Sequence, residues 1–210
     1  MGPSSTMRSS EGQFRVGRWH RMFAIATLLV ACGGCGKKKP EQPLRASAPD
    51  MVTLPNSMVV RVTAGKVQGI EPDGKLSWSL NLDAKERAVG NLAAAPNSVI
   101  YLRTNTSLRA ISPKGAWLWR APLPAASADG DSAPYSPAAL TDSTPIVLVQ
   151  RQTYRSYDLK GQKRWEVRLQ DEENPRTAPR ASPDGHCYVG TDSSLYQLSS
   201  DGLIGWRKAL

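Results

Sequence analysis

Apolar residues recur at fixed distances from a tryptophan in four segments of this chain. The segments, each 24 residues long, align without a gap at 55–78, 96–119, 142–165 and 183–206. Eleven and eight places before the tryptophan the residues are apolar in all four: Val67 and Ile70, Leu108 and Ile111, Tyr154 and Tyr157, and Leu195 and Leu198. Consecutive copies are 41, 46 and 41 residues apart. A period of this size is typical of repeated supersecondary units and predicts a propeller-type array.

Pairs of adjacent apolar residues indicate how these units pack. Nineteen and eighteen places before the tryptophans stand Val59 and Val60, Ile100 and Tyr101, Ile146 and Val147, and Cys187 and Tyr188. Neighbouring residues of a strand point to opposite faces of its sheet, so both faces must be covered. Strands of a sandwich normally alternate apolar with polar residues, whereas the stacked blades of a propeller cover each other on both faces. The pairs therefore favour a propeller.

Each repeat is expected to contain three strands, which in the last copy lie at about 186–191, 195–199 and 203–209. A fourth, inner strand is expected before each repeat, at 51–54, 92–95, 138–141 and 179–182. These inner segments include several Ala and Ser residues, which suit the crowded axis of a propeller, although a loop is the alternative. The prediction is an all-β array of four four-stranded blades, at about 51–82, 92–123, 138–169 and 179–210.

Every repeat ends in Gly-x-x-x-Trp. We expect the glycine to close the turn before the outermost strand, where a positive φ costs glycine little. The tryptophan four places on lies in that strand and is expected to be structural. The predicted structural positions are Gly74, Gly115, Gly161 and Gly202 with Trp78, Trp119, Trp165 and Trp206. Trp117 shares a strand face with Trp119, and packing is favoured over exposure for it.

The repeat, written PDGHCYVGTDSSLYQLSSDGLIGW in the last copy, resembles that of the pyrroloquinoline-quinone (PQQ) enzyme-like propellers. The resemblance covers residues 51–210 and implies that the four repeat tryptophans stack between neighbouring blades. It is specific for fold and not for function, because this repeat serves both quinone-dependent dehydrogenases and a non-enzymatic factor of outer-membrane protein assembly.

Propellers of this family usually close with seven or eight blades, whereas four repeats are present here. The four blades are therefore expected to form an open arc or an arc that a partner completes. A closed four-bladed ring and a fragment of a longer gene are the alternatives. An open arc exposes an apolar flank at each end unless something covers it.

The first 31 residues have the layout of a bacterial secretory signal. Four arginines precede the apolar run 22–31, which is too short to span a membrane and leads directly to Cys32. The sequence Leu-Val-Ala-Cys at 29–32 resembles the lipobox of bacterial lipoproteins, which implies cleavage before Cys32 and acylation of that cysteine. Cys35 is the rival anchor, but it lacks the aliphatic residue of the lipobox. An ordinary secretory peptide is the other alternative.

Residues 32–50 are rich in Gly, Lys and Pro and are interpreted as a flexible tether. Its run of three lysines at 37–39 would attract anionic lipid heads beside an acyl chain, and a merely solubilising role fits equally well. The whole chain has a formal charge of +9, and removal of the signal leaves 23 basic and 17 acidic residues, or +6. These charges are interleaved, so no nucleic-acid partner is expected.

Candidate catalytic groups are few. After signal removal His186 is the only histidine, which excludes multi-histidine metal sites within one chain. Its neighbour Cys187 invites a metal or thiol interpretation. Cys187 occupies an apolar column and is predicted to pack. The acidic run Asp171-Glu172-Glu173 is interpreted as a solvated loop rather than a calcium site. The loop 121–137 is a linker or a partner contact. No catalytic, cofactor-binding or metal-binding residue is predicted.

The chain is therefore expected to be a non-enzymatic, lipid-anchored protein of the bacterial envelope, at the outer membrane and facing the periplasm. Its propeller would present loops or edges to envelope protein partners, a layout that resembles the assembly-factor branch of the family. A second propeller half is one such partner. The alternatives are a PQQ-binding oxidoreductase or cofactor sensor, and a sugar- or peptide-binding surface module. The missing vicinal cysteine pair, which the family leads one to expect in a dehydrogenase, disfavours the oxidoreductase.

Overall fold

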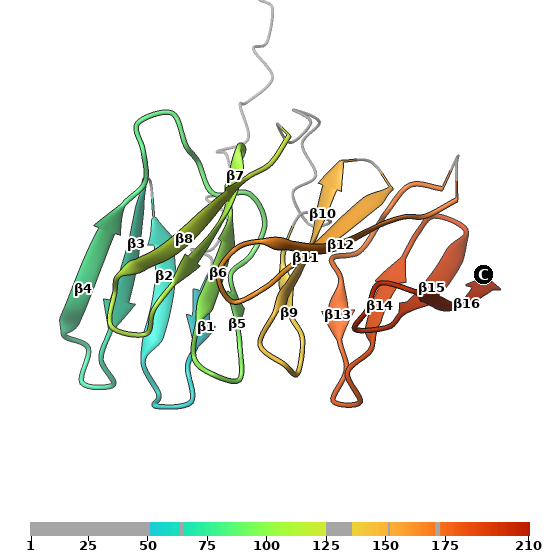
Figure 1. Ribbon diagram of the computed structural model, residues 1–210. Coiled ribbons are helices and arrows are strands. Elements are labelled where there is room, and N and C mark those ends of the chain that lie inside the picture. Colours follow the sequence, from blue (N-terminus) through green and yellow to red (C-terminus); the bar gives the residue numbers. More distant parts are fainter. Residues whose placement is uncertain (1–50, 64, 125–135, 151, 171–172) are drawn as a thin grey trace, which may run out of the picture. The chain divides into compact units, whose positions relative to one another are not determined.

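Four small antiparallel sheets follow one another along the chain (Figure 1). The structure is a computed structural model and describes residues 51–63, 65–124, 136–150, 152–170 and 173–210. The described residues form sixteen strands and no helix, four strands to a sheet, hydrogen-bonded in chain order. The all-β prediction and the four four-stranded blades are confirmed. In the described ranges no helix has the length and hydropathy needed to cross a membrane.

The first two blades hold strands β1 (Met51–Thr53), β2 (Val59–Thr63), β3 (Lys66–Ile70) and β4 (Leu76–Asn81), then β5 (Ala93–Ala94), β6 (Ile100–Arg103), β7 (Ser107–Ile111) and β8 (Trp117–Pro122). The last two hold β9 (Ala138–Ala139), β10 (Pro145–Gln150), β11 (Thr153–Tyr157) and β12 (Lys163–Arg168), then β13 (Arg180–Ala181), β14 (Cys187–Gly190), β15 (Ser194–Leu198) and β16 (Ile204–Ala209). The predicted inner segments are strands, although they are only two or three residues long. Each inner strand contacts the inner strand of the next blade.

The same tight turn joins the inner strand to the second strand in every blade. It is built on the tripeptides Pro-Asn-Ser, Pro-Asn-Ser, Thr-Asp-Ser and Pro-Asp-Gly at 55–57, 96–98, 141–143 and 183–185. The third residue has a positive φ, between 64° and 66° at the three serines and 86° at Gly185. The Asn or Asp side chain accepts a hydrogen bond from the amide two residues later in all four. Such Asx geometry stabilises the turn and was not among the features predicted from the sequence.

The third repeat departs from the gapless alignment by one residue. Ile146 pairs with Ala138 and Ser156, as Tyr101 pairs with Ala93 and Ala110. Ile146 is therefore the equivalent of Tyr101, and its predicted match to Ile100 is wrong. A register shift between Leu148 and Gln150 absorbs the difference. Because side chains alternate along a strand, this one-residue slip exchanges the faces to which the residues of β10 point.

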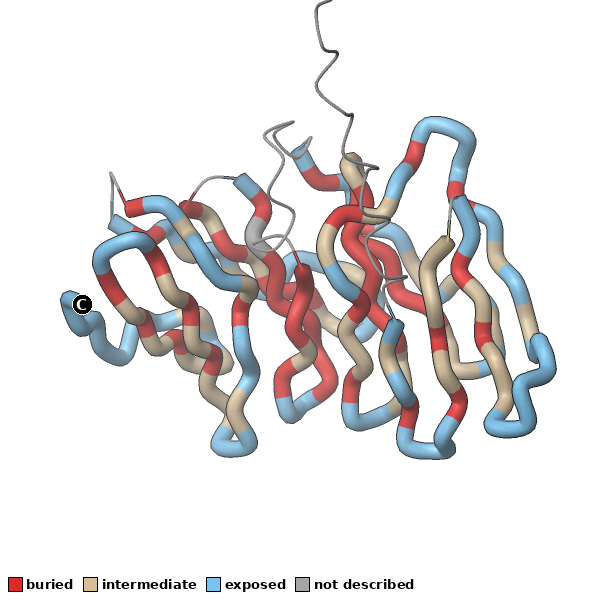
Figure 2. Tube along the Cα trace, turned by 180° about the vertical axis from the view of Figure 1, so that it is seen from behind, coloured by how far each residue is buried: buried red, intermediate tan, exposed pale blue. Residues whose placement is uncertain are grey.

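Three hydrophobic clusters fill the spaces between consecutive blades. The first joins blades one and two around Val60 and Ile100, the second joins blades two and three around Tyr101 and Val147, and the third joins blades three and four around Ile146 and Cys187. Both faces of each interior blade are therefore covered, as predicted (Figure 2). Cys187 is fully buried and its packing role is confirmed; burial raises the pKa of its thiol to about 12.

Candidate functional site

Each interior tryptophan lies against the glycine of the following blade. Trp78 lies on Gly115, Trp119 on Gly161 and Trp165 on Gly202, and a Cβ atom added to any of these glycines would come within 2.3–2.8 Å of the indole. The glycines have φ between 76° and 82°, and each closes the turn before an outer strand, as expected. Nε1 of Trp78 donates to the carbonyl of Pro113 at 3.1 Å, and Nε1 of Trp165 to that of Ser200 at 2.7 Å. This close approach requires glycine.

The outermost members of the series, Gly74 and Trp206, are not brought together. A Cβ atom on Gly74 would meet no heavy atom within 4 Å, and Trp206 is 40% exposed. All six residues of β16, Ile204 and Trp206 among them, are exposed (Figure 2), and the apolar Leu203 and Leu210 on either side of the strand are exposed too. The blades therefore form a partial propeller, in agreement with the predicted open arc.

Trp117 is part of a blade contact. It packs half-buried against the cluster between blades one and two, and the guanidinium of Arg109 lies 4.7 Å from the centre of its ring. A cation this close to an indole face is attracted by the ring quadrupole. The packing interpretation of Trp117 is confirmed, with Arg109 as a contact that the sequence did not indicate. The predicted strand face shared with Trp119 is wrong, because Trp119 packs against the cluster between blades two and three and a register shift between Ala110 and Ile111 separates the two tryptophans.

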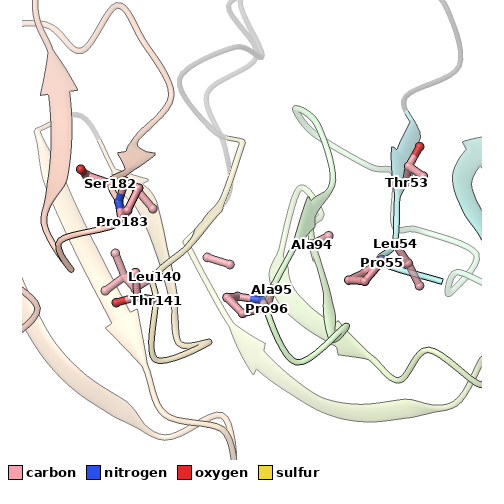
Figure 3. A pocket seen from close by; sticks show the side chains of 12 residues that line it. Thr53, Leu54, Pro55, Ala94, Ala95, Pro96, Leu140, Thr141, Ser182 and Pro183 are labelled. Atoms are coloured by element: carbon pink, nitrogen blue, oxygen red, sulfur yellow. The ribbon is translucent and has the colours of Figure 1, made fainter. Parts of the chain in front are cut away.

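An open hollow of about 510 Å³ lies where the turns of the four inner strands meet (Figure 3). Each blade contributes the same three positions: Thr53, Leu54 and Pro55; Ala94, Ala95 and Pro96; Ala139, Leu140 and Thr141; and Ala181, Ser182 and Pro183. The lining is apolar apart from three hydroxyl groups, and none of these twelve side chains is titratable. The hollow can therefore receive an apolar or hydrogen-bonding surface, but it supplies no general acid or base.

Two buried glutamates organise the loops at the opposite ends of the strands. Glu86 is 9% exposed and accepts hydrogen bonds from the hydroxyls of Thr104, Thr106 and Ser107, at 2.7–3.2 Å. It also pairs with Arg109 and with Arg120, the latter at 3.1 Å. A buried carboxylate surrounded in this way is held as an anion.

Glu173 repeats this arrangement in blade four. It is 5% exposed and accepts hydrogen bonds from Thr191 and Ser194 at 2.8 and 2.9 Å, and it pairs with Arg207. The prediction of a solvated acidic loop is therefore wrong for Glu173, because hydroxyl and guanidinium donors replace the water. Asp171 and Glu172 lie outside the described residues.

The two networks follow a period of two blades. Glu86, Thr104, Ser107 and Arg120 are each 87 residues before Glu173, Thr191, Ser194 and Arg207. This spacing was the signal in the sequence that could have revealed them. Burial alone would raise the pKa of both carboxyls, but the hydroxyl hydrogen bonds and the nearby guanidinium groups outweigh it and lower the pKa of each to about 2. Acids that stay ionised in this way serve structure rather than proton transfer at neutral pH.

The remaining candidate groups stand apart. His186 lies in the inner turn of blade four with Nδ1 3.1 Å from a carboxylate oxygen of Asp184. Across the ranges that the structure describes, no group of three or more His, Cys, Asp or Glu residues is arranged to hold a metal ion. The signal segment 1–31, the tether 32–50 with Cys32 and Cys35, and most of the loop 121–137 lie outside the described residues.

No protein-family model and no curated protein matches the sequence. Among solved structures, BamB from Moraxella catarrhalis is similar with a TM-score of 0.61 at 20% identity, over 76% of this chain and 48% of that chain. Virginiamycin B lyase from Staphylococcus aureus has a TM-score of 0.60 at 13% identity, over 80% of this chain and 57% of that chain. A streptogramin B lyase has a TM-score of 0.59 at 11% identity, over 75% and 53%.

The chain thus spans about half the length of these structures. At such identities the likeness concerns the fold alone, and it supports a partial β-propeller. The neighbours include both BamB and enzymes, so chemistry has to be argued from the sites of this chain.

Proposed function

We propose that this chain is a non-enzymatic, lipid-anchored protein of the bacterial envelope whose PQQ-like propeller serves as a scaffold for protein partners in outer-membrane protein assembly. The observation that carries the proposal is the hollow to which every blade contributes the same three positions, with an apolar and hydroxyl lining. Such a lining suits contact with a protein segment better than bond-making chemistry.

The distribution of charge also supports a non-enzymatic scaffold. The two carboxylates that are buried at the loops, Glu86 and Glu173, are saturated with hydroxyl and guanidinium donors from their own blades. They shape the loops, and neither of these two carboxylates is left unpaired to face a substrate. The likeness to BamB agrees with a scaffold, and the lipobox-like sequence at 29–32 supports an envelope location through acylated Cys32.

The residues present do not fit PQQ, the cofactor implied by the family resemblance. PQQ carries several carboxylates and needs cationic partners or a bound cation. The hollow has no charged lining residue, and the part of the chain that the structure describes contains no acidic cluster arranged for a cation. We therefore assign the chain no cofactor.

The second candidate function is that of an enzyme, and the structural likeness to two lyases supports this alternative. One solved structure is of a catalytically inactive virginiamycin B lyase in which a histidine is replaced by alanine, so a histidine matters in that protein. Here His186 lies beside Asp184, a pairing that can orient an imidazole as a base. Turnover that His186→Ala abolishes, with any streptogramin as the probe, would establish this alternative and sink the scaffold proposal.

The membrane anchor is tested by mass. Expressed in a bacterium, the chain is expected to begin at Cys32, carry an acyl mass and partition with membranes, because an acylated cysteine inserts its chains into the bilayer. Cys32→Ala should block acylation and cleavage at this position. Cys35→Ala is the matched control and should behave like the wild type. A mature, soluble form without acyl mass would contradict the anchor.

Partner binding is tested by crosslinking in living cells. A photo-crosslinking amino acid in place of Thr141, which lines the hollow, is expected to give discrete adducts with components of outer-membrane protein assembly. The same group in place of Lys160, which lies in the exposed outer turn of blade three, is the control and should give none. Equal adducts from both positions, or none from Thr141, would count against the hollow as the binding surface.

A further inference from the structure

Each end of the blade array carries one half of a tryptophan–glycine contact, and this contact occurs three times between consecutive blades. In the interior, a tryptophan of one blade covers the glycine of the next. Among the described residues, no atom lies within 4 Å of a Cβ placed on Gly74 at one end, and at the other end Trp206 is 40% exposed with no following glycine. The unfilled glycine and the uncovered indole are thus present in one chain.

The interface between blades two and three shows what a filled contact contains. Trp119 lies on Gly161, and the ring of Tyr101 packs 5.8 Å from that of Trp119. The hydroxyl of Tyr101 donates to the carbonyl of Ser143 in the inner turn of the next blade at 2.6 Å. Tyr101 is fully buried there. One aromatic pair therefore contacts two turns of the neighbouring blade.

Blade four presents the same aromatic pair, and no further blade follows it among the described residues. Tyr188 and Trp206 are each 87 residues after Tyr101 and Trp119, and their rings are 5.9 Å apart. Tyr188 is half-buried, whereas Tyr101 is fully covered. The residue that pairs with the tryptophan differs between the two blades: it is Gln197 in blade four and Ala110 in blade two. The Gln197 side-chain amide donates to the Tyr188 hydroxyl at 3.4 Å.

Blade one presents the two matching turns. Gly74 has φ +85°, close to the +82° of Gly161, and Ser57 has φ 66°, close to the 65° of Ser143. The face of blade one beside these turns is apolar and incompletely covered: Val59 and Ile70 are half-buried and Leu76 is 56% exposed. In blade two, Ile100 is the equivalent of Val59 and Ile111 is the equivalent of Ile70, and both are fully buried.

We propose that a second copy of this chain covers each end, with Trp206 of one copy docked on Gly74 of the other. By analogy with Trp78 and Trp165, the Trp206 indole N–H donates to the carbonyl of Pro72. By analogy with Tyr101, the Tyr188 hydroxyl donates to the carbonyl of Ser57. Two such head-to-tail contacts close a ring of eight blades. A heterologous interface gives a closed ring when the rotation that relates neighbouring copies returns to the first copy.

Two observations favour a second copy over a different partner. Both halves of the contact occur in the same chain, in the register of its interior interfaces. The chain also covers only 48% of BamB, so two copies supply about the length of one such propeller. The inference rests on the proposed function only in treating the blades as a scaffold.

The experiment counts copies. The full chain, purified in detergent at micromolar concentration, is expected to give a two-copy mass in native mass spectrometry. Trp206→Ala should weaken association by at least about 30-fold, the loss typical of a central interface tryptophan. Gly74→Asn should do the same, because asparagine tolerates a positive φ but its side chain fills the glycine cradle. The matched control Gly65→Asn has similar backbone geometry, φ +74° with no atom within 4 Å, and should keep two copies.

Mixing the two interface variants separates a head-to-tail contact from any other. Trp206→Ala and Gly74→Asn copies should each be monomeric alone, but together they retain one intact contact and should form mixed pairs. A single-copy wild type, a Trp206→Ala protein that still pairs, or a mixture that forms no mixed pairs would each overturn the proposal. The copy number is read independently of acylation and crosslinking, so failure of the proposed function remains distinguishable.

Discussion

Trp165→Ala is expected to lower the free energy of unfolding by about 3–5 kcal/mol. Its indole packs against the cluster between blades three and four, lies on Gly202 and donates to the carbonyl of Ser200 at 2.7 Å. Truncation removes the buried ring surface and leaves a void between two blades that have little else to move into it. Urea denaturation of the full chain in detergent, followed by far-ultraviolet circular dichroism, gives the free energy of unfolding and its m-value.

Two further variants separate the contributions to this loss. Trp165→Phe keeps a ring but loses the N–H donor, so it should cost about 1–2 kcal/mol less than the alanine variant. Gly202→Ala places a Cβ atom where the Trp165 ring lies and imposes a positive φ on alanine, so it should destabilise as well. A Trp165→Ala protein as stable as the wild type would show that the indole is not a packing element.

The sequence was sufficient to predict the repeated features that depend on nearby residues. The Gly-x-x-x-Trp pattern predicts a turn and the strand that follows it, and the turn at Gly115 is closed by backbone hydrogen bonds within residues 112–116. The apolar columns likewise place Val67 and Leu108 in the core, because strand alternation is local. These features therefore appear in each blade with one register.

Features that depend on distant residues could not be predicted in the same way. The shift in β10 changes no residue type in the pattern, since Ile146 and Val147 are both apolar, and only the strand pairing distinguishes them. Trp206 ends the same Gly-x-x-x-Trp pattern as Trp165, yet its exposure depends on whether a further blade faces it. The acidic run ending at Glu173 resembled a solvated loop because its donors Thr191 and Ser194 lie 18 and 21 residues away.

The network around Glu86 is expected to be as important for stability as an interior tryptophan. Glu86→Ala should lower the free energy of unfolding by about 3–5 kcal/mol, because it leaves the buried guanidinium of Arg109 with Asp83 as its remaining carboxylate. It also removes the carboxylate that accepts a hydrogen bond from the buried hydroxyl of Ser107. Glu166→Gln is the matched control, since Glu166 pairs with Arg155 at the surface, and it should change the stability by no more than about 1 kcal/mol.

The dependence on pH tests whether charge is the cause. The folded-state pKa of Glu86 is about 2, below its usual value of 4.5, so ionisation stabilises the fold above pH 4.5 and this contribution is lost as the pH falls toward 2. At neutral pH the shift corresponds to about 3 kcal/mol. The stability difference between the wild type and Glu86→Gln, which cannot ionise, should therefore shrink steadily between pH 4.5 and pH 2. If the difference stays constant over that range, Glu86 acts through shape rather than through its charge.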